Sequence, residues 1–359
     1  LPGEGTAPAK RIRSSSLFAS GEPGQGLRTA TFGGGVEYRE TRAARRNAPA
    51  IDRTARSDSL AVETQPGLGA IQKADFRGNV RFTDPPDFVA QAQQGIYDLT
   101  RDRLDLMPAA GLPGPPSPTV TDGNVSVAAR AIQFSLTSRE LTADTTVRST
   151  IDPKSRKGRG GSAAKTPSML DGDEPVNVTS NRLVYKGAAS AAVYTGRVTL
   201  WQGTDTTVKG DTITIDDRTG NLTAQGSATT AFVFEETDRR TGAKRRESTT
   251  GSAATFRYDD GKRMATYTGS AHMTGPQGDV VGERIELYLR PEVNELERAE
   301  AYGANGSVRV RESNRIAKGA HLTYTAADER YLLVGTPVEI VEERKGTCTL
   351  AVGATATFN

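Results

Sequence analysis

Apolar and polar side chains alternate along most of this chain, and residues 194–228 show the alternation best. Val198 and Leu200 stand two residues apart, and Ile213 and Ile215 repeat that spacing after a polar turn. A period of two is typical of half-buried β-strands, whereas an amphipathic helix would space its apolar residues three and four apart. A later D-R-T-G run is typical of a hairpin turn. The stretch therefore predicts consecutive β-strands.

The same unit recurs along the chain as an apolar pair on alternate positions, a polar turn with Asp, and a second alternating run with Gly. The recurring glycines are spaced about 30 to 43 residues apart, a period typical of stacked repeat folds, and they are Gly196, Gly226, Gly269, Gly303 and Gly335. One unit is too small to bury its own face, so neighbouring units must stack into one body. Because a mid-strand glycine marks a bend, the pattern predicts a sheet folded over along a line of bends.

Shifts in composition divide the chain into four parts. Residues 1–28 are rich in Gly, Pro, Ser and Arg without any period, and we expect a flexible tail there. Residues 29–151 hold weaker units, and residues 177–359 hold better preserved ones. Residues 152–176 combine Lys, Arg, Gly and Ser without an apolar period, which predicts a flexible linker or loop.

Composition agrees with many short strands rather than with a thick globular core. Hydrophobic residues make up 35% of the 359 residues, aromatic residues make up only 6%, and there are 38 glycines. The net charge of +3 favours no polyanionic partner. No apolar run approaches the roughly 18 residues of a membrane span. Since the chain starts at Leu1 and not at Met, we expect a mature or trimmed product, and the sequence leaves open whether a signal peptide or an inner-membrane anchor preceded it.

The residues that most often carry catalysis are sparse and scattered. His272 and His321 are the only histidines, far apart in sequence, and the Asp pairs at 216–217 and 259–260 occupy turns, where Asp is favoured for local hydrogen bonds. Cys348 is the single cysteine and stands in an alternating strand, where we expect a small buried side chain. No nucleophile elbow, phosphate-binding loop or zinc-ligand spacing occurs. We therefore expect no enzyme, no metal and no cofactor.

Basic side chains gather at two loops, and they could meet phosphates of a lipid headgroup or membrane surface. A solvated loop is the favoured explanation, and nucleic acid is disfavoured because no aromatic residues are interleaved with them. The two groups are Arg42, Arg45 and Arg46, and Arg239, Arg240, Lys244, Arg245 and Arg246.

The repeat pattern resembles the OstA-like family of lipopolysaccharide transport proteins, the periplasmic LptA and LptC type. The best matching stretches are L-W-Q-G-T-D-T-T-V-K-G-D-T-I-T-I-D-D-R-T-G (200–220, continuing to 228), G-D-V-V-G-E-R-I-E-L-Y-L (278–289), E-L-E-R-A-E-A-Y-G (295–303) and A-K-G-A-H-L-T-Y-T-A-A-D-E-R-Y-L-L-V-G-T-P-V (317–338). A weaker likeness to LptC covers A-D-F-R-G-N-V-R-F (74–82) and D-G-N-V-S-V-A-A-R-A-I (122–132). The linker, a Pro-rich insertion and the length leave open a fused LptC–LptA arrangement or a divergent paralogue.

The resemblance implies an all-β fold, an elongated twisted β-jellyroll made of a folded, V-shaped antiparallel sheet that is open along one seam. In that family the acyl chains of lipopolysaccharide occupy an apolar trough while the sugars stay in solvent. The implied partners are the inner-membrane Lpt ABC transporter complex and an outer-membrane LptD-type translocon. The implied place is the periplasm, with head-to-tail self-association through terminal edge strands such as Ala354–Phe358.

The inward-facing apolar positions are the candidate lipid-binding residues. They are Val198, Leu200, Ile213, Ile215, Leu222, Ala224, Phe256, Tyr258, Tyr267, Met273, Ile285, Leu287, Leu322, Tyr324, Leu333 and Ile340. A dry core would show the same pattern, so we expect central residues to pack and those near the seam to touch lipid. The alternative function is a structural or adhesive β-solenoid of the bacterial envelope, and a β-helical polysaccharide-active enzyme is weaker still. Variable unit lengths and short turns favour antiparallel hairpins over closed parallel coils.

Overall fold

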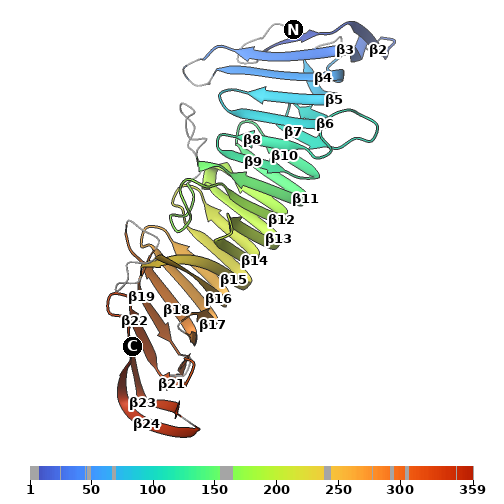
Figure 1. The fold of residues 1–359 in the computed structure, drawn as a ribbon. Coiled ribbons are helices and arrows are strands. Elements are labelled where there is room, and N and C mark those ends of the chain that lie inside the picture. The colour runs from blue at the N-terminus through green and yellow to red at the C-terminus, as the bar shows by residue number, and fades with distance from the viewer. Residues whose placement is uncertain are drawn as a thin grey trace. The chain divides into compact units, whose positions relative to one another are not determined.

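The computed structural model describes residues 8–24, 26–44, 46, 50–66, 70–153, 165–237, 244–276, 278–291, 295–303, 307–344 and 346–358. Strands dominate these residues, and they are joined by turns that include a short 3-10 turn, η2 (Gly187–Ala189), so the predicted all-β fold class is confirmed (Figure 1). The chain forms two compact units, one of Leu1–Ala164 and Thr179–Ala192, the other of Lys165–Val178 and Val193–Asn359. Within the described residues, no helix is long and apolar enough to cross a membrane.

The first unit is built from antiparallel ladders. Its strands are β1 (Ala9–Arg13), β2 (Ser16–Glu22), β3 (Gly26–Arg42), β4 (Ile51–Thr64), β5 (Ile71–Asp84), β6 (Phe88–Asp98), β7 (Arg103–Met107), β8 (Thr119–Asp122), β9 (Val125–Ala128), β10 (Ala131–Ser135), β11 (Glu140–Ile151) and most of β12 (Val176–Lys186). The long strands β3 to β6 pair in chain order. The C-terminal half of β6 pairs with β7, and its N-terminal half pairs with β8, so the sheet divides into two arms at this strand.

The second unit repeats this plan. Its strands are β13 (Ala191–Gln202), β14 (Thr206–Asp216), β15 (Leu222–Thr237), β16 (Lys244–Asp259), β17 (Met264–Gly275), β18 (Gly278–Leu289), β19 (Leu296–Tyr302), β20 (Val308–Arg311), β21 (Arg315–Gly319), β22 (His321–Thr325), β23 (Arg330–Arg344) and β24 (Thr347–Phe358). Long strands β14 to β18 pair in order. One half of β18 then pairs with β19 and the other with β20, and β23 rejoins the arms through β22 and β21.

Glycines in left-handed conformations mark the bend between the two arms. In β15 and β17, Gly226 and Gly269 have φ of +78° and +86°, and each is followed by a serine at +51°. The ladders shift register at both places, and such bulges bend a strand. A Cβ on Gly226 would stand 2.3 Å from Oδ2 of Asp211, so only glycine fits there.

The predicted line of bends is therefore confirmed at Gly226 and Gly269, and Gly196 shares their conformation with φ of +83°. Gly335 lies where the β23–β24 ladder shifts register between Val334 and Val338. Gly303 differs, because it directly follows β19, where the chain leaves one arm and enters the other at β20.

Two segments expected to lack secondary structure are more ordered than their sequences suggest. The predicted tail contains β1, β2 and the start of β3, because β1 and β2 pair with the two halves of β3. Most of these residues are exposed, so they have no apolar period that would reveal the strands. In the predicted linker, residues 165–175 form turns fixed by hydrogen bonds to the second unit, and residues 154–164 lie outside the described part.

The expected burial of Cys348 is wrong. This residue lies in β24 and is exposed, like its neighbours Leu350 and Val352, which are each 62% exposed. Strand β24 pairs with β23, and no second layer covers either face over most of its described length. Alternation therefore identified the strand but not its burial.

Candidate functional site

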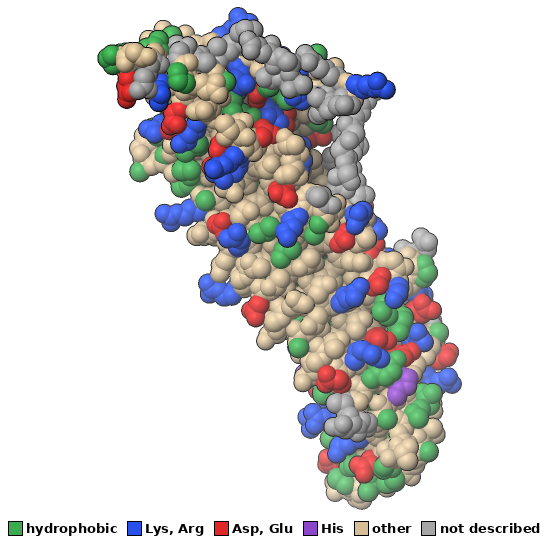
Figure 2. Space-filling view, turned by 180° about the vertical axis from the view of Figure 1, so that it is seen from behind, with side chains coloured by type: hydrophobic (Ala, Val, Ile, Leu, Met, Phe, Trp, Pro, Cys, Tyr) green, Lys and Arg blue, Asp and Glu red, His purple; other side chains and the backbone are tan. Residues whose placement is uncertain are grey.

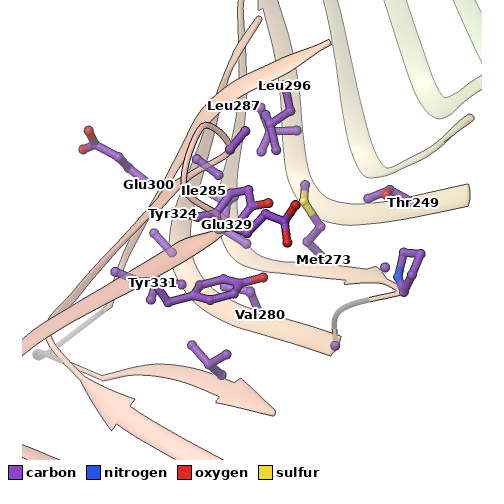
Figure 3. A pocket seen from close by; sticks show the side chains of 18 of the residues that line it. Thr249, Met273, Val280, Ile285, Leu287, Leu296, Glu300, Tyr324, Glu329 and Tyr331 are labelled. Atoms are coloured by element: carbon purple, nitrogen blue, oxygen red, sulfur yellow. The ribbon is translucent and has the colours of Figure 1, made fainter. Parts of the chain in front are cut away.

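The second unit contains a cavity of about 450 Å³ between its arms, and this cavity is open to solvent (Figure 3). Five of the predicted lipid-binding residues line this cavity. They are Met273, Ile285, Leu287, Leu322 and Tyr324. Strands β17, β18 and β22 supply them, at the alternate inward positions that the sequence predicted.

The small side chains of the neighbouring strand β19 explain why the interior is unfilled here. Ala301 of β19 pairs with Ile285 of β18 on one side and with Leu322 of β22 on the other, and Ala299 pairs in the same way with Leu287 and Tyr324. Two alanines thus occupy the middle of a row whose other members are large. Because alanine leaves the space that a larger side chain would fill, the interior stays open at this point.

The remaining candidates mostly belong to a packed core. Ten of them are at most 1% exposed, namely Val198, Leu200, Ile213, Ile215, Leu222, Ala224, Phe256, Tyr258, Tyr267 and Leu333. Aromatic rings fill the interior there, with the Phe256 and Tyr267 centroids 4.9 Å apart. The hydroxyl of Tyr267 hydrogen-bonds to Thr230 at 2.6 Å, and burial raises its pKa. Ile340 is half-buried and lies away from the cavity lining.

The cavity also contains residues that the sequence did not single out. Leu296, Val280 and Tyr331 are half-buried and line it together with the two alanines. Inward alanines on an alternating strand were the available signal, but their effect depends on which strands flank them. That pairing is a tertiary property, since β19 lies between β18 and β22, and β22 is not the next strand in sequence.

Acidic side chains dominate the charged part of the cavity lining. Glu247 and Glu329 line it, and so does the ion pair in which Nη1 of Arg290 donates to Oε2 of Glu295 at 3.0 Å. Glu300 belongs to the lining strand, but its side chain points away from the cavity in Figure 3. The cavity therefore combines an apolar interior with a rim of net negative charge.

A network on the outer face holds the strands behind the cavity. Oε1 of Glu300 lies 2.7 Å from Nη1 of Arg298, and the Tyr302 hydroxyl donates to the same carboxylate. Burial opposes ionisation of Glu300, but these hydrogen bonds and charges outweigh it and lower its pKa. Burial and a hydrogen bond to Glu286 raise the pKa of Tyr288 to about 12. These pairs lie within one strand, and the contacts between β18 and β19 are cation–π contacts of Arg284 over the Tyr302 ring and of Arg298 over the Tyr288 ring, each at 4.2 Å.

The first unit carries charge in its interior. Arg53 is 7% exposed, and its Nη1 donates to Oδ1 of Asp102 at 2.7 Å and to the Tyr97 hydroxyl at 2.9 Å. Burial raises the pKa of Glu40, which lies 3.7 Å from Arg53. Burial also opposes ionisation of Asp102, but hydrogen bonds from Thr137 and Tyr97 and the Arg53 charge lower its pKa. This part of the interior is polar rather than a lipid trough.

The side chains considered for catalysis do not converge. His272 lies 3.6 Å from Asp279, while His321 stacks on a tyrosine of the outer network and lies 3.3 Å from Glu300. Asp216 caps its own turn through backbone N–H groups. Among the described residues, no group of His, Cys, Asp or Glu could hold a metal ion.

Asp260 anchors the segment that joins the second unit at residue 165. Its Oδ1 accepts the Ser168 N–H at 2.6 Å, and its Oδ2 pairs with Nζ of Lys165 at 2.6 Å. Burial opposes ionisation of Asp260, but these contacts lower its pKa. Asp260 therefore holds the segment at residues 165–168 against the turn that follows β16.

The two predicted basic clusters lie partly outside the described residues, which exclude Arg45, Arg239 and Arg240. Of the hairpin group, Arg246 pairs with Asp205. On the face shown in Figure 2, basic and acidic side chains are interspersed, so neither sign dominates that surface.

Comparison with known proteins gives one match by sequence. Residues 177–293 match the family described as LptA/(LptD N-terminal domain) LPS transport protein. No curated protein matches the chain. Among solved structures, the crystal structure of LptH, the LptA-homologous periplasmic component of the lipopolysaccharide transport device of Pseudomonas aeruginosa, is 21% identical, with a TM-score of 0.30 over 37% of this chain and 85% of that chain. Over residues 177–293, this chain is therefore similar to the LptA/LptD N-terminal family of lipopolysaccharide transport proteins.

Proposed function

We propose that this protein is a non-enzymatic component of lipopolysaccharide transport that carries acyl chains in the cavity of its second unit. The single observation that carries the proposal is an apolar cavity inside the second unit, to which most of the residues that match an LPS transport family, 177–293, belong. Its volume of about 450 Å³ lies within the range of small-molecule sites. Burial of each acyl CH₂ contributes about 0.8 kcal/mol, which suits reversible holding of a lipid in transit.

The proposed place of action is the periplasm, as part of a bridge between an inner-membrane Lpt ABC transporter complex and an outer-membrane LptD-type translocon. Strand β24 supports addition of a further strand, because it pairs with β23 and carries exposed Leu350 and Val352. Exposed strand edges recruit other strands. The antiparallel ladders argue against the alternative of a structural or adhesive β-solenoid, whose closed coils would pair in parallel.

Photocrosslinking to lipopolysaccharide tests the transport proposal. A benzophenone amino acid at Tyr331, which lines the cavity, should give a lipopolysaccharide adduct in the native envelope. The same probe at Leu332, the next residue of β23, which is 37% exposed and does not line the cavity, should give none. If the folded Tyr331 variant gives no adduct, or both positions label equally, the cavity does not carry the lipid.

Crosslinking from the terminal strand tests the bridge. A probe at Leu350 should join β24 to a second copy of this chain or to another Lpt component in intact cells. Glu283, an exposed position of β18, provides the matched control and should give no such product. Absence of any protein adduct from Leu350 would count against assembly through β24 and would leave lipid binding unaffected.

A further inference from the structure

The charged side chains that line the cavity are mostly acidic. Arg290 is the cation of the described lining, and it is paired with Glu295 at 3.0 Å. No described cation forms an ion pair with Glu247 or Glu329. Among the side chains that the structure describes, these two carboxylates therefore have no ion-pair partner, and they lie beside an interior that is otherwise apolar.

The position of Glu329 places one of these charges at the entrance. Glu329 lies in the turn between β22 and β23, is exposed, and has φ of +50°. In Figure 3 its side chain is directed inward, toward the ring of apolar side chains around Met273. By contrast, Ile285, Leu287 and Leu322 on the cavity floor are at most 3% exposed. A ligand that inserts its chain toward this floor leaves its head group beside the carboxylates.

We propose that this cavity selects amphiphiles whose head group at the rim carries no net negative charge, in the order cationic, then uncharged, then anionic. The inference depends on the proposed function, because it assumes that the cavity takes an alkyl or acyl chain. Coulomb repulsion by carboxylates near the protein surface disfavours an anionic head group and attracts a cationic one. A phosphorylated lipid would then bind with its phosphates held away from Glu247 and Glu329.

Three ligands that share a dodecyl chain and differ in their head groups separate the contribution of the head group to binding from that of the chain. We would titrate the full chain at low salt with dodecyltrimethylammonium, dodecyl maltoside and dodecyl phosphate, each below its critical micelle concentration, by isothermal calorimetry. The dissociation constant should be lowest for the ammonium and highest for the phosphate. The differences should shrink when salt is raised to about 0.5 M, because screening shortens the range of the charges.

Charge-neutralising variants assign the effect to the rim. Each of Glu329→Gln and Glu247→Gln should tighten dodecyl phosphate about fivefold and weaken the ammonium similarly, while the maltoside changes less than twofold. Glu339→Gln removes an exposed carboxylate of β23 that does not line the cavity, and should change nothing. Ala299→Phe, which fills the cavity, should reduce binding of all three ligands.

The outcomes separate this inference from the proposal on which it depends. If none of the three amphiphiles binds the full chain, the lipid-carrying function fails. If all bind but the phosphate binds as tightly as the ammonium, or the two rim variants match Glu339→Gln, charge selection fails while lipid binding stands. If Ala299→Phe folds and still binds the ammonium unchanged, binding occurs elsewhere and the inference fails.

Discussion

Substitution of Gly269 by alanine should destabilise the second unit strongly. Gly269 lies mid-strand in β17 with φ of +86°, at the register shift between Thr268 and Ala271. A Cβ built there would stand 2.8 Å from Cβ of Ala254 on β16, and that atom cannot rotate away. Two independent costs therefore follow from one added methyl group.

The magnitude comes from adding those costs. A non-glycine residue in the left-handed region costs about 1–2 kcal/mol. Relief of the Cβ–Cβ contact needs a backbone shift comparable to overpacking, which costs about 1–3 kcal/mol. We therefore expect the free energy of unfolding of the second unit to fall by about 3 kcal/mol. With a urea m-value near 3 kcal/mol/M, the midpoint should fall by about 1 M.

Fluorescence of the single tryptophan reports on this unit alone. Trp201 lies in β13, in the part of that strand assigned to the second unit. Urea unfolding would be compared with Gly261→Ala, a turn position with ordinary φ where the nearest atom to a new Cβ is 3.7 Å away. That control should stay within about 0.5 kcal/mol of the parent.

Equal midpoints for Gly269→Ala and Gly261→Ala would refute the reasoning. The double variant Gly269→Ala/Ala254→Gly divides the two costs, because removal of the facing methyl group relieves the contact and leaves the φ penalty. A cycle that shows no coupling between the two positions would mean that the contact contributes nothing.

Three further predictions follow from the polar contacts and the terminal strand. Asp260→Asn should speed tryptic cleavage after Lys165, because it removes the ion-pair partner of the Lys165 side chain. Since folding lowers the pKa of Asp260, the variant should be less stable than the parent by the full amount at pH 7, and this difference should shrink below about pH 4, where the carboxylate becomes protonated. Arg53→Met should cost the first unit about 3–5 kcal/mol, measured by hydrogen exchange, because it removes the buried cation that Glu40 and Asp102 share. Cys348 should react with a thiol reagent in native buffer nearly as fast as in urea.

Each of these has an outcome that would contradict it. Unchanged cleavage in Asp260→Asn, with Asp259→Asn as the matched control, would mean that the anchor at 165 does not depend on this carboxylate. Unchanged exchange in Arg53→Met would mean that the network contributes no net stability. A protected Cys348 thiol would mean that β24 is covered.

Alternation of side chains was sufficient to predict the all-β fold, and glycine spacing was sufficient to predict the bends at Gly226 and Gly269. Both are local properties, since the two-residue period and the positive φ are determined by the strand itself. The strands β1 and β2 escaped prediction because their exposed residues carry no period, although backbone pairing with β3 orders them.

The candidate site, too, could be predicted from the sequence only in part. Sequence alone identified Ile285, Leu287 and Leu322 as inward-facing, and these do line the cavity. It identified Ile213 in the same way, yet that residue is 0% exposed in a packed core. Only the tertiary structure decides between these outcomes, because the space beside an inward residue depends on the strands that flank it. The alternating pattern determines which face of a strand is apolar, whereas the alanines of β19, placed between β18 and β22, determine where that face stays open.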